Sequence, residues 1–95
     1  MHTVFITPTA AKDIISAVNY YSAKAEGLGE RLANEIDGLL IRVAELPMSF
    51  TIRYRKIRAA KVPSFPYLLF YKVNEHNKSI EVLRVFNTHQ QPFWI

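Results

Sequence analysis

The chain has 95 residues, no cysteine and an apolar fraction of 49%. This composition excludes a disordered chain and a disulfide framework, and the length leaves room for a single domain over residues 1–95. No run of 18 apolar residues is present, and the first residues lack the basic and apolar regions of a signal peptide. We therefore expect a cytoplasmic protein with no membrane partner.

The charge is distributed unevenly along the chain. Residues 1–50 hold four Lys/Arg and six Asp/Glu, a net charge of −2, whereas residues 51–95 hold eight Lys/Arg and two Asp/Glu, a net charge of +6. Such asymmetry favours a polyanionic partner, either nucleic acid, a nucleoprotein or an acidic protein. A mildly basic surface without such a partner is the alternative interpretation.

The N-terminal half begins with a strand and continues with two helices. His2–Ile6 is a short β-type run, and Thr7 and Pro8 then supply an N-cap and a first helical residue. Apolar residues at helical spacing predict a helix over Pro8–Lys24.

A second amphipathic helix is expected over Leu28–Leu46, where Pro47 stops it. The glycines of the link, AEGLGE, predict a tight turn, so the two helices should form a helical hairpin. Gly38 lies inside the second helix, where it costs about 1 kcal/mol relative to alanine. We therefore expect a neighbour packed close to its backbone.

The C-terminal half reads as strands. Tyr54–Val62 is a strand candidate with cations on both faces, Tyr67–Val73 is apolar enough for a buried central strand, and Asn74–Ser79 is a turn. Ile80–Asn87 is the last strand. The expected fold is α+β, in the order β-α-α-β-β-β, with an antiparallel sheet and the N-terminal helical hairpin packed on one face.

Simple alternation along the last strand assigns its side chains to two faces. It places Ile80, Val82, Arg84 and Phe86 on one face, with Leu83 and Val85 on the other. We expect Phe86, together with side chains of residues 67–71, to cover the helical hairpin.

A cluster of cations is the strongest local feature of the sequence. Five fall within nine residues: Arg53, Arg55, Lys56, Arg58 and Lys61. Closely spaced Arg and Lys side chains can hold phosphates and stabilise charge in phosphoryl transfer without a metal. Two other interpretations remain open, a solvated edge strand kept from pairing by its charges and a docking site for an acidic segment.

Arg84 and His89 are the other candidate site residues. Arg84 lies among apolar residues in mid-strand, so it is either paired across the sheet or exposed in a groove where it can grip a phosphate. His89 titrates near neutrality and can act as a general acid or base, or it is an ordinary surface residue. His2, His76 and His89 lack metal-site spacing, and no cofactor motif is present, so we expect neither metal nor cofactor.

Several features together resemble the RelE/ParE superfamily, the toxins of type II toxin–antitoxin modules, which includes plasmid stabilisation toxins. They are the element order, the helix opening TPTAA, the phrase RKIRAAKVPSFPYLLFYKVNEHNKSIEVLRVFNTHQQP and the closing Trp94. The resemblance covers nearly the whole chain, and FPYLLFYKV followed by a hairpin is its most specific part.

The resemblance implies a bacterial growth inhibitor with one of two activities. RelE-like members cut mRNA in the ribosomal A site without a metal, and ParE-like members inhibit DNA gyrase. Both are neutralised by a small antitoxin whose C-terminal segment wraps the toxin. It therefore implies a cognate antitoxin as a partner, and we expect the protein to be isolated with the antitoxin in a hetero-oligomer or else to self-associate, for example as a homodimer.

Three features favour the ParE branch: the FPY sequence at residues 65–67, Pro92 near the end of the chain, and the long helical hairpin. In an mRNA endonuclease, Arg58, Arg84 and His89 would be the catalytic residues, and Arg55 and Lys61 would bind phosphates beside them. In a gyrase inhibitor, the same basic surface, with Arg53, Arg55, Lys56 and Lys61, would dock on an acidic protein or on the gyrase–DNA complex. A third possibility is an inactive relic that still binds antitoxin.

The tail departs from the family pattern. ParE-like tails read approximately histidine-glycine-arginine-arginine-aspartate-proline, whereas here Asn87 holds the histidine position and His89 and Gln90 align with the arginines. Phe93 and Trp94 are expected to pack back on the sheet or beneath a partner.

Overall fold

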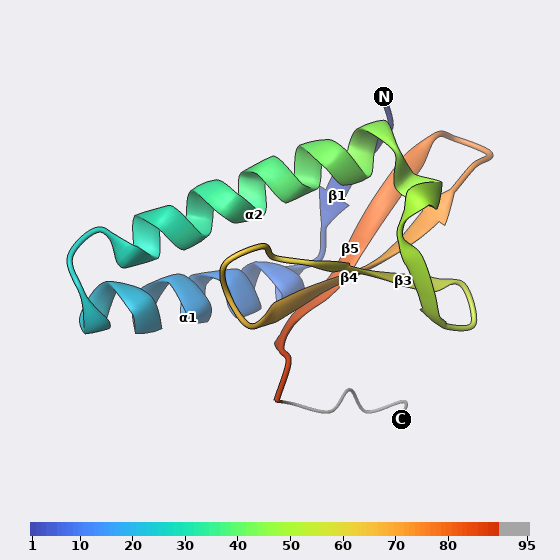
Figure 1. Ribbon diagram of the computed structural model, residues 1–95. Coiled ribbons are helices and arrows are strands. Elements are labelled where there is room, and N and C mark those ends of the chain that lie inside the picture. Colours follow the sequence, from blue (N-terminus) through green and yellow to red (C-terminus); the bar gives the residue numbers. More distant parts are fainter. Residues whose placement is uncertain (90–95) are drawn as a thin grey trace.

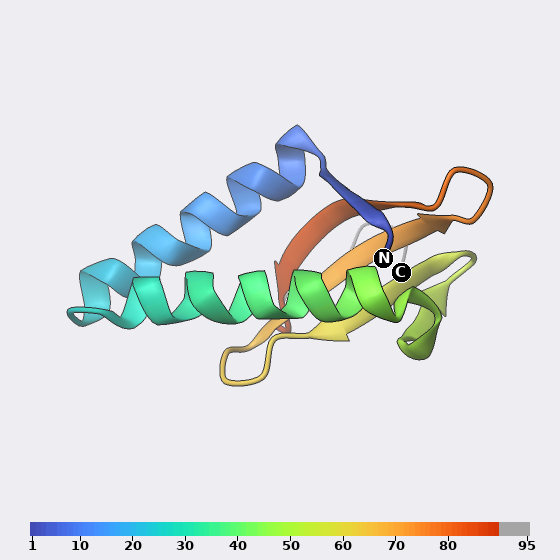
Figure 2. The same ribbon diagram turned by 90° about the horizontal axis from the view of Figure 1, so that it is seen from above.

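The computed structural model describes residues 1–89 and shows a helical hairpin on one face of a five-stranded sheet (Figure 1). The elements in chain order are β1 (Thr3–Ile6), α1 (Pro8–Lys24), α2 (Leu28–Glu45), the 3-10 helix η1 (Pro47–Ser49), β2 (Thr51–Tyr54), β3 (Ile57–Lys61), β4 (Tyr67–Asn74) and β5 (Ser79–Asn87). The tip of the hairpin extends past the sheet (Figure 2). None of the helices in residues 1–89 is long and apolar enough to cross a membrane.

The start of α1 follows the capping signal in the sequence. The Thr7 hydroxyl accepts a hydrogen bond from the Ala10 amide at 3.1 Å, and Pro8 occupies the first helical turn. The same hydroxyl donates to the Leu83 carbonyl at 3.0 Å. Thr7 therefore caps the helix and also ties its first turn to strand β5.

Two glycines shape the link between the helices. Gly27 adopts a positive φ of 79°, a conformation that favours glycine. A Cβ at Gly29 would collide with Ser22 Oγ and come within 2.6 Å of the Val18 carbonyl oxygen. Close packing is therefore at Gly29, and the prediction for Gly38 is wrong, because a Cβ there would meet only the Arg42 guanidinium at 3.7 Å.

The sheet is mixed, with the strand order β1-β5-β4-β3-β2. The pairs β2–β3, β3–β4 and β4–β5 are antiparallel, but β1 runs parallel to β5. The prediction of a wholly antiparallel sheet is therefore wrong at this edge. Strand direction depends on how the helical hairpin returns the chain, and no local sequence pattern reports it.

The predicted strand over residues 54–62 is two strands. β2 ends at Tyr54, Arg55 and Lys56 form a turn, and β3 begins at Ile57. Arg55 takes a positive φ of 52° in this turn. Because no glycine or asparagine occupies the turn, the sequence lacks the usual hairpin signal.

Strand β5 contains a bulge at Leu83. Phe70 pairs with Arg84 and Tyr71 pairs with Val82, so Leu83 has no partner on β4. The extra residue reverses the alternation, which places Val85 in the core beneath the helices and Phe86 on the opposite face. The prediction that Arg84 and Phe86 share a face with Val82 is therefore wrong.

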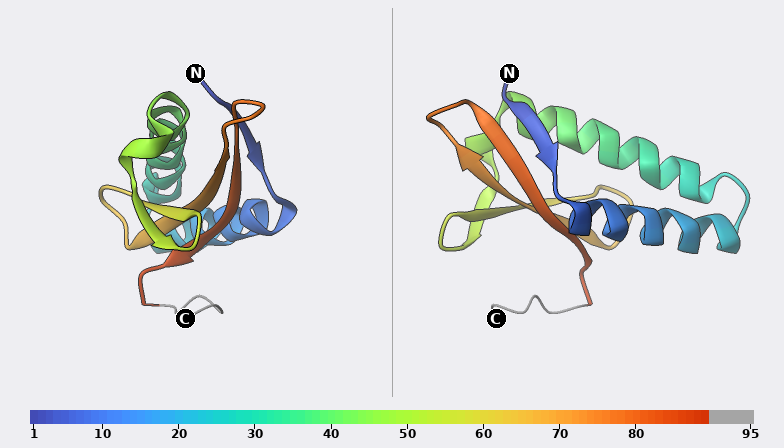
Figure 3. Two further views of the ribbon diagram at one scale, coloured as in Figure 1. Left: turned by 90° about the vertical axis from the view of Figure 1, so that its right-hand side faces the viewer. Right: turned by 180° about the vertical axis from the view of Figure 1, so that it is seen from behind.

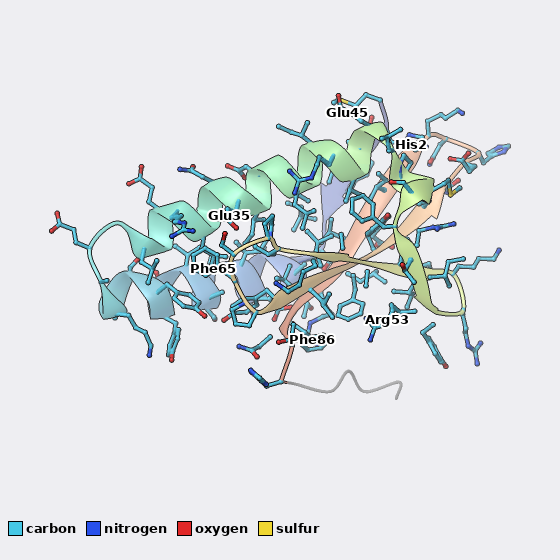
Figure 4. All side chains as sticks on the ribbon, in the orientation of Figure 1. His2, Glu35, Glu45, Arg53, Phe65 and Phe86 are labelled. Carbon is cyan, nitrogen blue, oxygen red and sulfur yellow. The ribbon has the colours of Figure 1, made fainter. Side chains whose placement is uncertain are left out.

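Two groups of buried apolar residues lie on the two faces of the sheet. The main core joins both helices to alternate residues of the strands, including Tyr67, Leu69 and Tyr71 of β4. A smaller cluster on the other face contains Ala59, Phe70 and Phe86. The rings of Phe70 and Phe86 pack edge to face, with their centroids 5.8 Å apart. Figure 4 shows Phe86 on the side of the sheet away from α2. The prediction for Phe93 and Trp94 lies outside the described residues.

Candidate functional site: the basic hairpin and its groove

The five clustered cations lie on the basic hairpin, which we define as β2, β3 and the turn between them. Arg53, labelled in Figure 4, and Lys56 are exposed, and neither side chain makes an ion pair or hydrogen bond within residues 1–89. Arg55 Nε donates to Tyr54 Oη at 3.1 Å, and its guanidinium lies 5.3 Å from the centroid of that ring. Three cations are thus presented to solvent at one end of the molecule.

Arg58 is held by the protein itself. Its Nη1 donates to the Phe50 carbonyl at 2.7 Å and to the Met48 carbonyl at 3.2 Å. These bonds fasten the segment between α2 and β2 to strand β3. Beside them, the hydroxyl of the buried Tyr71 donates to the Pro47 carbonyl at 2.6 Å. Burial raises the pKa of Tyr71 to about 12, an effect that the nearby Arg58 charge partly opposes.

Lys61 is also occupied by backbone carbonyls. Its ammonium donates to the carbonyls of Val62 and Phe65, both at 2.6 Å. Between these two carbonyls, the Ser64 amide donates to the carboxylate of Glu35 of α2 at 2.8 Å. This bond lowers the pKa of Glu35 below its ordinary value. Lys61 therefore shapes the β3–β4 loop, which projects from the sheet beside the helices (Figure 4).

An open groove of about 840 Å³ lies beside the basic hairpin. Four cations line it, Arg55, Lys56, Arg58 and Lys72, and so do two acids, Glu75 and Glu81. Its apolar lining includes Phe5, Met48 and Ile52, each about half exposed. The groove therefore combines positive charge with accessible apolar surface, a combination suited to a protein segment as well as to a polyanion.

Arg84 lies outside this groove and is paired with helix α1. Its Nε and Nη2 donate to the two carboxylate oxygens of Asp13 at 2.8 Å and 3.0 Å. The guanidinium also lies 4.2 Å from the centroid of the Phe86 ring. Arg84 is therefore neither paired across the sheet nor exposed in the groove to bind a phosphate, which were the two possibilities considered from the sequence.

His89 lies in the turn after β5 and is exposed. Its backbone amide donates to Asn87 Oδ1 at 2.8 Å. Of the three residues predicted as catalytic, Arg58 alone is among the described residues that line the groove. The structure therefore gathers Arg53, Arg55 and Lys56 at one place but does not bring Arg58, Arg84 and His89 into one described pocket.

The sequence analysis missed Asp13, Lys72 and the apolar lining of the groove. Asp13 is the only acidic residue of α1, and it lies one turn after Ala10 on the buried side of that helix. An acid at such a position indicates that its carboxylate has a partner within the protein. Lys72 carried a weaker signal as the lone charge in an apolar strand. Phe5, Met48 and Ile52 come from three separate segments, and only the folded sheet brings them together.

The fold is similar to those of solved structures of toxins and toxin–antitoxin complexes. The structure is similar to that of the Escherichia coli RelBE toxin–antitoxin complex, with a TM-score of 0.67 and 18% identity, covering 95% of this chain and 100% of the other. It is also similar to a chromosomal ParDE system of P. aeruginosa, with a TM-score of 0.64 and 17% identity over 92% and 96% of the two chains. The isolated E. coli RelE toxin gives a TM-score of 0.66 with 18% identity, over 99% and 92%.

At these identities the similarity establishes a fold shared with RelE and ParE toxins. The sequence profile of the family described as "ParE toxin of type II toxin-antitoxin system, parDE" matches residues 4–92. The chain therefore belongs to this family, within the RelE/ParE superfamily. No curated protein sequence matches it.

Proposed function

We propose that this chain is a growth-inhibiting toxin that acts by docking its basic hairpin on DNA gyrase, and that a cognate antitoxin neutralises it. The observation that carries the proposal is that some cations are exposed to solvent while others are bonded to groups within the protein. Arg53 of β2 and the turn residues Arg55 and Lys56 are exposed, and Arg55 bonds the adjacent Tyr54 side chain. Arg58 and Arg84 are instead engaged by backbone carbonyls and by Asp13, respectively.

The contacts of Arg58 and Arg84 argue against the nuclease alternative. A residue that stabilises a phosphoryl transition state must aim its donors at the substrate. Arg58 instead aims Nη1 at two backbone carbonyls, and Arg84 aims Nε and Nη2 at Asp13. Binding RNA through these donors would require breaking bonds that hold the fold together.

The groove favours a protein target over a bare nucleic acid. Exposed apolar side chains such as Met48 and Ile52 gain stability when a protein surface covers them, and they gain little from phosphates. The adjoining cations supply the long-range attraction to an acidic partner. We therefore expect the contact on gyrase to be an acidic surface that also presents apolar side chains.

A cognate antitoxin as the neutralising partner is supported by family membership and by the structural relatives. The RelBE and ParDE structures to which this chain is similar are toxin–antitoxin systems. The groove offers such a partner both apolar and charged contacts. We therefore expect the antitoxin to cover some or all of the surface that docks on the target.

Pulse labelling after induction in a bacterial host tests the proposal. Thymidine incorporation into DNA and amino-acid incorporation into protein are followed during the first minutes. We expect DNA synthesis to fall first, and purified gyrase to lose supercoiling activity when the chain is added. An earlier fall in protein synthesis would instead support the RelE-like endonuclease, and unimpaired growth would support an inactive relic.

A pair of charge reversals locates the docking surface. Arg53→Glu reverses an exposed cation of the basic hairpin, and Lys12→Glu reverses an exposed cation on α1 with the same change in net charge. We expect Arg53→Glu to weaken gyrase inhibition by about tenfold or more, because it places a like charge against an acidic surface. Lys12→Glu should inhibit as the parent does. Equal inhibition by both variants would remove the basic hairpin from the interface.

A further inference from the structure

The face of the sheet away from the helices carries apolar side chains that are almost fully buried. Ala59, Phe70 and Phe86 come from three neighbouring strands and are 8%, 2% and 9% exposed, respectively. Both helices pack over the main core on the opposite face and contribute no residue to this cluster. A sheet that is covered on one side only leaves its other face in contact with water. The burial of these three side chains therefore requires a cover on this face.

Neighbouring side chains of the sheet account for part of this burial. The Arg84 guanidinium lies 4.2 Å from the centroid of the Phe86 ring, and the rings of Phe70 and Phe86 pack edge to face. Ile57 and Leu68 also pack against the cluster. Each of these two lies two residues before a member of the cluster on the same strand, so it stands beside that member on the same face. They flank the cluster and leave the outer side of the Phe70 ring to be covered.

The part of the chain beyond residues 1–89 has the composition of such a cover. Residues 90–95 read QQPFWI, with no charged side chain and with two large aromatic ones. Aromatic side chains bury about 150–250 Å² each when they pack. The three cluster residues are buried within a single chain, so the cover belongs to that chain rather than to a second copy or a partner. Since α1 and α2 lie on the other face, residues 90–95 are the segment that can supply it.

Strand β5 leads the chain directly to this cluster. The Thr88 amide donates to the Pro66 carbonyl at 2.7 Å, which fixes the end of β5 beside the start of β4. The His89 amide then donates to Asn87 Oδ1 at 2.8 Å, in a turn that redirects the chain. This end of β5 points away from α2 in both views of Figure 3. The six residues that follow can extend over about 20 Å, whereas β3 lies two strand spacings, about 10 Å, from β5.

We propose that residues 90–95 fold back across the open face of the sheet and complete a second, smaller core. In this arrangement the side chains of Phe93 and Trp94 pack on the rings of Phe70 and Phe86. Aromatic pairs of this kind stabilise a fold beyond the area that they bury. The inference stands on the burial of the sheet face and is independent of the proposed function.

This cover has two consequences for the surfaces of the molecule. Ala59 belongs to β3 of the basic hairpin and lies opposite Phe70 of β4, so a segment packed across both holds the hairpin to the rest of the sheet. The open face is also withdrawn from contact with a target or an antitoxin. The groove and the exposed side of the basic hairpin then remain as the surfaces for partners.

The fluorescence of Trp94 in the full chain tests the proposal, because it is the only tryptophan. We expect the folded chain to emit at a shorter wavelength than the urea-unfolded chain, and to be quenched by acrylamide several-fold less, since a packed indole is removed from water. Both properties should be the same at low and high protein concentration. Equal quenching in the folded and unfolded chains would overturn the proposal, and so would burial of Trp94 that appears only at high concentration.

A matched pair of lysine substitutions locates the cover. Ala59→Lys places a charge beneath it, whereas Thr51→Lys places the same charge at the exposed position directly opposite on β2. We expect Ala59→Lys to shift the Trp94 emission to longer wavelength and to raise its quenching towards that of the unfolded chain. Thr51→Lys should behave as the parent does, and far-ultraviolet circular dichroism checks that both are folded. Unchanged Trp94 emission in folded Ala59→Lys would remove the segment from this face.

Nuclear Overhauser contacts in the unmodified chain decide the point even if Ala59→Lys fails to fold. We expect cross-peaks between the indole protons of Trp94 and the ring protons of Phe70 or Phe86. A Trp94 indole that shows contacts only to residues of the helices would overturn the proposal. None of these measurements uses gyrase, so their failure and the failure of the proposed function are separate results.

Discussion

Asp13 and Arg84 join helix α1 to strand β5 through a two-pronged ion pair with N–O distances of 2.8 Å and 3.0 Å. The same carboxylate accepts the Val85 amide at 3.0 Å, at the edge of β5 where β1 has already ended. The side chains are 17% and 30% exposed, respectively, and hydrogen bonding to Asp13 raises the pKa of Arg84 above its ordinary value. The Asp13 carboxylate therefore accepts hydrogen bonds both from the backbone of β5 beside its bulge and from the Arg84 side chain.

Removing this carboxylate should destabilise the fold. Asp13→Ala leaves Arg84 and the Val85 amide without their partner, and we expect a loss of about 2–3 kcal/mol in the free energy of unfolding. Urea denaturation at pH 7 measures it. Asp37→Ala, at an exposed position of α2, is the control and should change stability by less than about 0.5 kcal/mol. A loss for Asp13→Ala no larger than for the control would mean that the ion pair contributes nothing.

Arg58 should behave as a structural residue rather than as a purely functional one. Arg58→Ala removes the donors to the Met48 and Phe50 carbonyls, and we expect it to lower stability by about 1–2 kcal/mol. Arg53→Ala, from the exposed strand beside it, should change stability by less than about 0.5 kcal/mol. Thermal or urea unfolding of the two variants decides the point. Loss of growth inhibition in Arg58→Ala or Arg84→Ala identifies a functional residue only when folding is shown to be intact.

The two glycines of α2 should respond in opposite directions to alanine. Gly29→Ala drives a Cβ into Ser22 Oγ and the Val18 carbonyl, so the helices must separate at a cost of about 1–3 kcal/mol. Gly38→Ala meets only the Arg42 side chain and should stabilise the protein by about 0.5–1 kcal/mol. Comparison of the two urea midpoints with the parent tests both. A stabilising Gly29→Ala would contradict the close approach of the helices.

We expect the protein to lose stability at alkaline pH, where the buried Tyr71 hydroxyl would ionise. Its pKa in the folded protein is raised to about 12 by burial, above an unfolded value of about 10, so the folded state holds the proton more tightly. Its contribution is complete below pH 10 and is lost as the pH rises towards 12. The expected loss is about 1 kcal/mol at pH 11.

Tyr71→Phe isolates this effect from other groups that titrate at alkaline pH. The variant loses the hydrogen bond to the Pro47 carbonyl and should be less stable by about 1–2 kcal/mol at pH 8. Its stability should then fall less steeply than that of the parent between pH 8 and pH 11. Parallel profiles for the two proteins would show that Tyr71 does not titrate in this range.

Elements marked by local signals could be predicted from the sequence. The Thr7-Pro8 start of α1 and its end at Lys24 were predicted at the observed residues, and the Asn74–Ser79 turn lies where turn-forming residues cluster. The basic hairpin was visible as a cluster of cations, because charge density is a property of composition. Caps, turn residues and periodicity act between residues a few positions apart, so they can be read directly along the chain.

The tertiary structure decided which residues meet across the chain. It made β1 parallel to β5, divided the segment after Phe50 into two strands, and turned Arg84 and Phe86 to the other face through the bulge at Leu83. It also chose between the possible partners of Arg84 by placing Asp13, 71 residues away, beside it. Such pairings depend on how the helices pack on the sheet as a whole, and a one-residue bulge changes every later side chain, so no local pattern determines them.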